Sequence, residues 1–183
     1  MRLALECHPE TPCSAPIHVE VEAGRSGSRL SLHFRVIGDN RGLLMPNPAT
    51  PAFRDGLWWH SCFEAFIRAD QGDGYCELNL SPSGEWAAYA FDNYREGMRP
   101  VDPLPALAIA VARSDSSIEL TGQVDLSGVA ALPAARSWRL GISAIVEDAY
   151  GNKSYWALAH SPGAPDFHHK DCFALELPAP GGT

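Results

Sequence analysis

The chain has 183 residues, of which 45% are apolar and 20% are charged, so it is long enough for one well-buried domain and too short for two ordinary ones. Its formal net charge of -8 offers no basic surface to phosphate groups or anionic lipid headgroups, which argues against nucleic-acid binding and membrane binding. No apolar run approaches the roughly 18 residues needed to span a bilayer.

Strand-like runs separated by turn residues follow one another along the chain. Fifteen prolines and 16 glycines punctuate short stretches rich in β-branched and aromatic residues, a pattern typical of strands joined by turns. The expected strands are Leu3–Cys7, Ile17–Ala23, Arg29–Ile37, Ser61–Arg68, Tyr75–Leu80, Trp86–Phe91, Leu107–Arg113, Ile118–Val124, Trp138–Glu147, Ser154–Ala159 and Cys172–Leu177.

Alternation within these runs predicts which residues face the core. Between Leu30 and Val36 every second residue is apolar, including Phe34, and the residues between them are polar. A period of two is the signature of a half-buried strand. About eleven such strands without crossover helices predict an all-β fold, an antiparallel two-sheet β-sandwich formed by residues 1–177 as a single domain. Residues 178–183, rich in proline and glycine, are expected to form a flexible tail.

The N-terminal residues and the cysteines indicate the cellular compartment in which we expect the protein. Glu6 and Pro9 interrupt the N-terminal residues, so we do not expect a secretory signal. The five cysteines are an odd number, contain no C-x-x-C motif and are expected to be free thiols that suit a reducing compartment. We therefore expect a cytoplasmic protein, either a monomer or a homodimer.

Aromatic rings and carboxylates lie close together in the stretch from Asp55 to Met98. It holds three of the five tryptophans, and it contains the neighbours Phe63 and Glu64 as well as Glu85 and Trp86. Flat aromatic faces next to fixed carboxylates suit a polar, ring-shaped ligand such as a sugar. The stretch therefore predicts a binding site for a polyhydroxylated small molecule.

Two of the expected strands would gather polar side chains on one face. If Ser61–Arg68 and Tyr75–Leu80 pair as a hairpin, the side chains of Glu64, Arg68, Glu77 and Asn79 share one side of the sheet. Carboxylates accept hydroxyl hydrogen bonds and an amide both donates and accepts. The alternative is a solvated outer face with a surface ion pair of little energetic value.

The same stretch carries a family resemblance. The segments LWWHSCFEAFI, SPSGEWAAYAFDNYREGM, LGISAIVED, SYWALAH and PDFHHKD resemble the bacterial DOMON-like proteins, relatives of the family 9 carbohydrate-binding modules. The resemblance implies a jelly-roll-like β-sandwich and a site that clamps a sugar between two tryptophans. By that resemblance Trp58 and Trp156 are the two walls, Glu64 and Asn79 hold hydroxyl groups, and Arg68 or Arg95 orients the ligand. Lys153 departs from the pattern, because sugar-binding relatives tend to carry an amide there.

Three other functions stay open at this point. Other DOMON branches hold haem, and Met45 or Met98 with His160 or His168 would be the candidate ligands, although we expect no cofactor. Glu64 and Glu77 could instead act as the carboxylate pair of a glycan hydrolase, although no catalytic motif is present. Exposed tryptophans could also form the interface of a structural dimer. We expect no metal site, because the adjacent His168 and His169 would point apart on a strand. The sequence thus favours non-catalytic carbohydrate binding.

Overall fold

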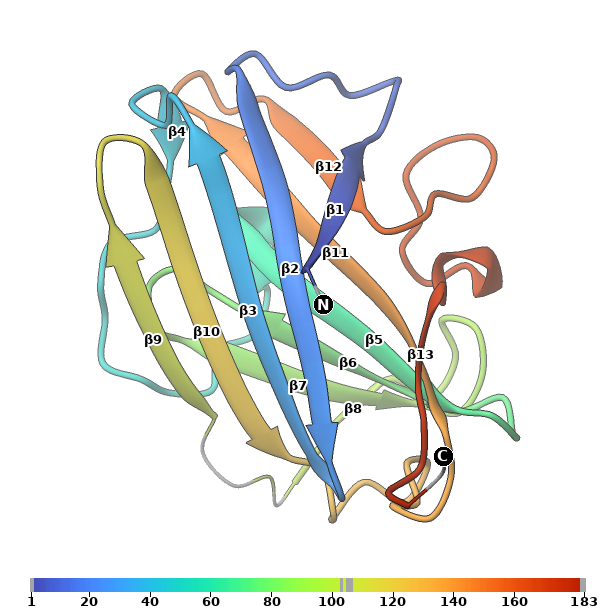
Figure 1. Cartoon of the computed structure of the whole chain (residues 1–183). Coiled ribbons are helices and arrows are strands. Elements are labelled where there is room, and N and C mark those ends of the chain that lie inside the picture. Colours follow the sequence, from blue (N-terminus) through green and yellow to red (C-terminus); the bar gives the residue numbers. More distant parts are fainter. Residues whose placement is uncertain (1, 103, 105–106, 182–183) are drawn as a thin grey trace.

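The computed structural model describes residues 2–102, 104 and 107–181 (Figure 1). They form thirteen strands and two short 3-10 helices. The strands are β1 (Arg2–Cys7), β2 (Ile17–Ser26), β3 (Arg29–Gly38), β4 (Leu43–Leu44), β5 (Cys62–Ala69), β6 (Tyr75–Leu80), β7 (Trp86–Phe91), β8 (Arg99–Pro100), β9 (Ala108–Arg113), β10 (Ser117–Asp125), β11 (Trp138–Asp148), β12 (Lys153–Ala157) and β13 (Leu175–Leu177). The 3-10 helices are η1 (Leu57–Trp59) and η2 (Lys170–Cys172).

All thirteen strands belong to one curled antiparallel sheet. Its order is β8-β7-β6-β5-β11-β12-β1-β2-β3-β10-β9, and β13 and β4 also pair with β11. The first strand joins the two halves: Leu5 pairs with Val19 of β2, and Cys7 pairs with Trp156 of β12. In Figure 1 the half formed by β2, β3, β10 and β9 lies in front of β5, β6, β7 and β11. The predicted all-β antiparallel fold is confirmed. The strands form one continuous sheet through β1, so the two-sheet sandwich and its jelly-roll-like connectivity stay predictions.

The main core lies between these two halves. Alternate apolar residues of β2, β3 and β10 pack against alternate apolar residues of β5, β6 and β11. The rings of Phe34 and Phe63, one from each half, are 5.0 Å apart between centroids. Trp138 is fully buried there, and the Arg25 guanidinium stacks 3.6 Å above its ring. Each large apolar side chain that is fully buried in this core contributes about 1.5–3 kcal/mol to stability through the hydrophobic effect.

The half that contains β5, β6, β7 and β11 is buried on both faces. Every residue of β6 and all but Arg68 of β5 are buried. On the face turned away from the main core, Phe66, Tyr75, Tyr89 and Phe167 belong to a second apolar cluster. A sheet covered on both sides has room for a ligand cavity only where the outer cover is incomplete, and that is where the candidate site lies.

The expected strands match the observed ones closely in position. The exception is Cys172–Leu177, whose first residues belong to η2, so that β13 begins at Leu175. The expected tail at 178–183 lies partly outside the described residues, and the carbonyl of Pro178 accepts a hydrogen bond of 3.4 Å from Arg25. No helix of the described residues is long and apolar enough to cross a membrane.

Candidate functional site

A cavity of about 300 Å³ opens on the outer face of the half-sheet formed by β5, β6, β7, β11 and β12. The strands supply its floor through Glu64 and Phe66 of β5, Glu77 of β6 and Ile145 of β11. The segments outside the strands and the rim of β12 supply its walls. These wall residues are Trp58, Arg95, Met98, Tyr155, Phe167 and His168.

The hairpin of β5 and β6 brings the two carboxyl groups together. Glu64 lies directly opposite Asn79 in the register, and Phe66 lies opposite Glu77. Glu77 is therefore the diagonal neighbour of Glu64 on the same face, where such pairs are about 7–8 Å apart between Cα atoms. The predicted hairpin and its polar face are confirmed.

Glu64 is a buried carboxyl group with few partners. It is 2% exposed, and the Ser143 hydroxyl of β11 donates a hydrogen bond of 3.2 Å to its Oε2 atom. Burial, reinforced by the negative charge of Glu77, raises the pKa of Glu64 to about 8. At neutral pH Glu64 therefore carries a proton and can donate a hydrogen bond into the cavity.

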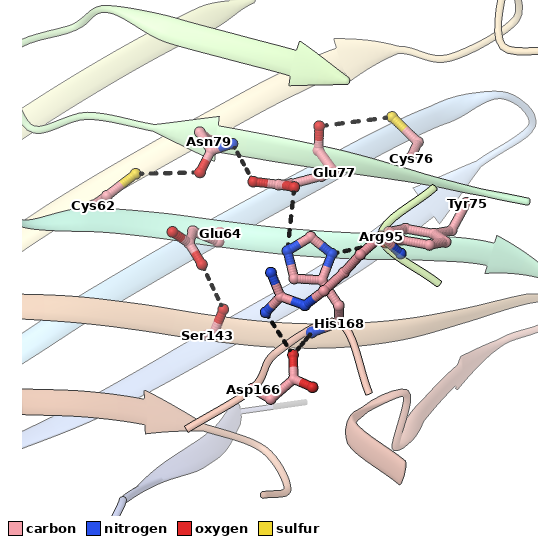
Figure 2. A network of polar contacts seen from close by, with 10 residues as sticks. All are labelled: Cys62, Glu64, Tyr75, Cys76, Glu77, Asn79, Arg95, Ser143, Asp166 and His168. Atoms are coloured by element: carbon pink, nitrogen blue, oxygen red, sulfur yellow. Dashed lines mark hydrogen bonds and ion pairs between the residues drawn. The ribbon is translucent and has the colours of Figure 1, made fainter. Parts of the chain in front are cut away.

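Glu77 is held by an amide and faces a histidine. Asn79 donates a hydrogen bond of 2.8 Å to its Oε1 atom, and Nε2 of His168 lies 3.8 Å from its Oε2 atom (Figure 2). Burial raises the pKa of Glu77, while the bond from Asn79 counteracts the rise. The Cys62 thiol lies 3.7 Å from the Asn79 carbonyl oxygen. Both ends of the amide are thus engaged inside the protein.

A hydrogen bond with the Tyr75 hydroxyl holds the His168 ring in place. The Tyr75 hydroxyl lies 2.7 Å from Nδ1 of His168 and accepts a hydrogen bond of 3.1 Å from the backbone N–H of Arg95. Burial, assisted by the charge of Arg95, lowers the pKa of His168 to about 4, so the ring is neutral. Donation from the Tyr75 hydroxyl to Nδ1 corresponds to the tautomer of His168 that carries its ring hydrogen on Nε2, the atom that faces Glu77.

Arg95 lies at the rim of the cavity, where it is hydrogen-bonded to Asp166. Its guanidinium donates a hydrogen bond of 2.8 Å to Asp166, and the Tyr94 hydroxyl donates one of 2.5 Å to the same carboxylate. Burial alone would raise the pKa of Asp166, but these bonds outweigh it and lower the pKa. Arg95 has φ of 57°, a left-handed conformation that costs energy in a residue with a side chain. The rim is therefore a fixed structure that holds Arg95 beside His168.

The structure brings four of the seven predicted site residues to the cavity and leaves three outside it. Trp58, Glu64, Glu77 and Arg95 line the cavity. Asn79 is fully buried behind Glu77, and Arg68 faces a neighbouring hollow. The predicted position of Trp156 is wrong. Neighbours on a strand face opposite sides, and Trp156 points into the main core, where it is 7% exposed and its ring N–H donates to Ser154.

The aromatic side chain that β12 offers to the cavity is that of Tyr155, next to Trp156. The sequence analysis missed this residue, although the strand period combined with a buried Trp156 would have indicated it. Phe167 and the cavity position of His168 were also missed, because both follow a long connection whose path has no periodic signal. No group of three or more potential metal ligands occurs among the described residues.

The fold is shared with solved structures of carbohydrate-binding proteins. A Bacteroides uniformis ATCC 8492 protein proposed to bind carbohydrate matches with a TM-score of 0.68 at 14% identity, over 94% of this chain and 83% of that one. A family 9 carbohydrate-binding module from Caldicellulosiruptor kristjanssonii in complex with glucose gives 0.55 at 10% identity, over 98% and 86%. One from the same organism in complex with cellotriose gives 0.50 at 9% identity, over 87% and 74%. Likeness at these identities establishes the fold alone. No family model and no curated protein matches the chain.

Proposed function

We propose that the cavity binds a carbohydrate or a similar polyhydroxylated small ligand and does not transform it. The observation that carries this proposal is the pairing of two buried carboxyl groups, Glu64 and Glu77, with aromatic walls in one cavity. Hydroxyl groups need both acceptors and donors, and a protonated Glu64 next to Glu77 offers both. The solved neighbours that bind glucose and cellotriose support the same ligand class.

The walls of the cavity suit the apolar face of a sugar ring. Trp58 and Tyr155 are half-buried, so their rings have accessible surface, and Phe167 adds a buried ring. Stiff aromatic rings gain contact area at a small entropic cost. The volume of about 300 Å³ falls at the small end of ligand cavities, which suits a monosaccharide or the end of a chain.

Titration with glucose and cellotriose tests the proposal by tryptophan fluorescence and calorimetry. Saturable binding should weaken by about 1–3 kcal/mol in Trp58→Ala. Trp59→Ala is the matched control, because Trp59 is the adjacent tryptophan, is 64% exposed and does not line the cavity. The proposal fails if no sugar in a wider glycan panel binds, or if both variants weaken binding equally.

Two observations favour other functions, and each has its own test. Met98 and His168 line the same cavity, which favours haem, but ligation by His168 would have to displace its Tyr75 or Glu77 partner. A Soret band after incubation with haem would support that function. Glu64 and Glu77 share the cavity, which favours glycan hydrolysis. Hydrolysis of a glycan that is lost in Glu77→Gln would replace the binding proposal.

The same combination of fold and sequence segments supports membership in the DOMON-like relatives of the family 9 modules. We propose that relationship from the resemblance of the segments around Glu64, Trp86 and His168. Its site would differ from the two-tryptophan clamp, since β12 contributes Tyr155 to the cavity in place of Trp156.

A further inference from the structure

A second hollow of about 400 Å³ adjoins the cavity and shares His168 with it. It lies beside the ends of β5 and β6 that are far from Glu64, and the segment around η2 covers it. Its polar lining includes the basic residues Arg68 and Lys170, with Asp73 as the acidic one. The rings of Tyr75 and Phe173 form its apolar lining.

Arg68 is an incompletely satisfied cation in this hollow. Its Nε atom is buried and has no hydrogen-bond partner among the described residues. Its guanidinium lies 5.0 Å from the centroid of the Phe173 ring, which helps to hold the planar group in place. A buried donor without a partner costs free energy. The Nη1 and Nη2 atoms of the same guanidinium also form no hydrogen bond with the described residues, and unlike Nε they are not sealed off, so a ligand in the hollow can supply them with an acceptor.

A second arginine, Arg139, lies opposite Arg68 and makes a negatively charged partner for Arg68 more favourable. Arg139 of β11 is the directly opposite partner of Arg68 in the register, so both side chains leave the sheet on the same side. Glu176 neutralises Arg139 through an ion pair of 3.0 Å, whereas no ion pair of Arg68 occurs in the described part of the chain. Like charges directly opposite each other destabilise a strand pair. Arg68 is therefore the arginine of this pair that lacks a counter-ion among the described residues, and an anion at its Nη atoms would supply one.

We propose that this hollow binds a small oxyanion, a carboxylate or phosphate group, through the fork of Arg68 with Lys170 as the second cation. A guanidinium matches two oxygens of such a group at once, and charge-assisted bonds of this kind are strong. The exposed Asp73 lies on the same hollow and opposes the anion, which sets a moderate affinity. The oxyanion is either a free ion or the acidic substituent of a ligand whose ring lies in the cavity beyond His168.

The test is a titration of the folded protein with inorganic phosphate at constant ionic strength, followed by amide NMR. Saturable shifts should concentrate around Arg68, Asn93 and Lys170. Arg68→Met should weaken binding about tenfold or more, and Arg68→Lys should weaken it less, since it keeps the charge and loses the fork. Asp73→Asn should strengthen binding. Arg35→Met is the matched control, because Arg35 pairs with Glu20 on the other half of the sheet.

The affinities of the protein for glucose, glucuronate and glucose 6-phosphate, compared with one another, identify the source of the oxyanion. Tighter binding of an acidic sugar that is lost in Arg68→Met supports a ligand that spans both hollows. Phosphate shifts without any such preference support a free anion. The proposal is overturned if phosphate causes no saturable shift, or if Arg68→Met with an intact amide spectrum binds phosphate as tightly as the unaltered protein. Neither of these outcomes bears on neutral sugars in the cavity.

Discussion

The buried carboxyl groups of Glu64 and Glu77 lie diagonally across the pair of strands β5 and β6, on the face of the sheet that carries the cavity. Both pKa values are raised, and burial is the largest cause in each case. Two neighbouring carboxyl groups in a desolvated site resist ionisation together. The pair therefore makes both stability and ligand binding depend on pH in a predictable direction.

The stability of the protein should fall as pH rises from about 4.5 to about 8, through the contribution of Glu64. In this interval the folded carboxyl keeps its proton while the unfolded one loses it, so the folded state binds more protons and raising the pH favours unfolding. Glu64→Gln should flatten this slope and stabilise the protein at pH 8 by on the order of a few kcal/mol.

Urea unfolding at a series of pH values measures this effect. Glu119→Gln is the control, since it changes a carboxyl group on the outer face of β10 that pairs with His33. An identical slope in the unaltered protein and in Glu64→Gln would contradict the prediction.

Adjacent residues of β12 should respond to truncation in opposite ways. Tyr155 lines the cavity and is half-buried, so Tyr155→Ala should weaken sugar binding by about 1–3 kcal/mol and change stability little. Trp156 lies in the main core, so Trp156→Ala should cost about 3–5 kcal/mol of stability. Calorimetric titration and thermal unfolding of both variants measure the two effects. Loss of sugar binding in a well-folded Trp156→Ala protein, with full binding in Tyr155→Ala, would reverse the assignment.

Removing the Tyr75 hydroxyl should loosen the rim of the cavity. Tyr75→Phe leaves both Nδ1 of His168 and the backbone N–H of Arg95 without their partner, at a cost of about 1–3 kcal/mol. NMR of the His168 ring nitrogens should show a hydrogen on Nε2 in the unaltered protein and a mixture of tautomers in the variant. Tyr150→Phe is the control, because Tyr150 is 91% exposed. An unchanged His168 spectrum in Tyr75→Phe would mean that the hydroxyl does not set the tautomer.

Gly38 should tolerate no side chain. Its φ is 129°, and a Cβ atom there would lie 2.3 Å from the carbonyl oxygen of Pro16. Gly38→Ala should therefore destabilise the protein by about 1–3 kcal/mol or more. Gly42→Ala is the matched control, because a Cβ atom at Gly42 would have no neighbour within 4 Å. Equal melting temperatures for the two variants would show that the turn before β2 can move aside.

The hairpin of β5 and β6 could be predicted from the sequence because a period of two determines the face of every residue in a strand. Glu64 and Glu77 were placed together by that rule alone. The choice between Tyr155 and Trp156 could not be made in this way, since both are aromatic and either face of β12 could have been the core. His168 reaches the cavity through a connection without periodicity, so only tertiary structure shows its bond to Tyr75.

The central position of β11 has a consequence for synthesis on the ribosome. β11 pairs with β5, β12, β13 and β4, and β12 in turn pairs with Cys7 of β1. Until residue 138 has been made, the edges of β5 and β1 that later receive these partners are bare. Bare edges invite pairing with other chains, and such long-range contacts form slowly. Because His168 completes the cavity wall, a nascent chain can capture a ligand only after residue 168 has been made, and a ligand cannot assist the folding steps that precede it.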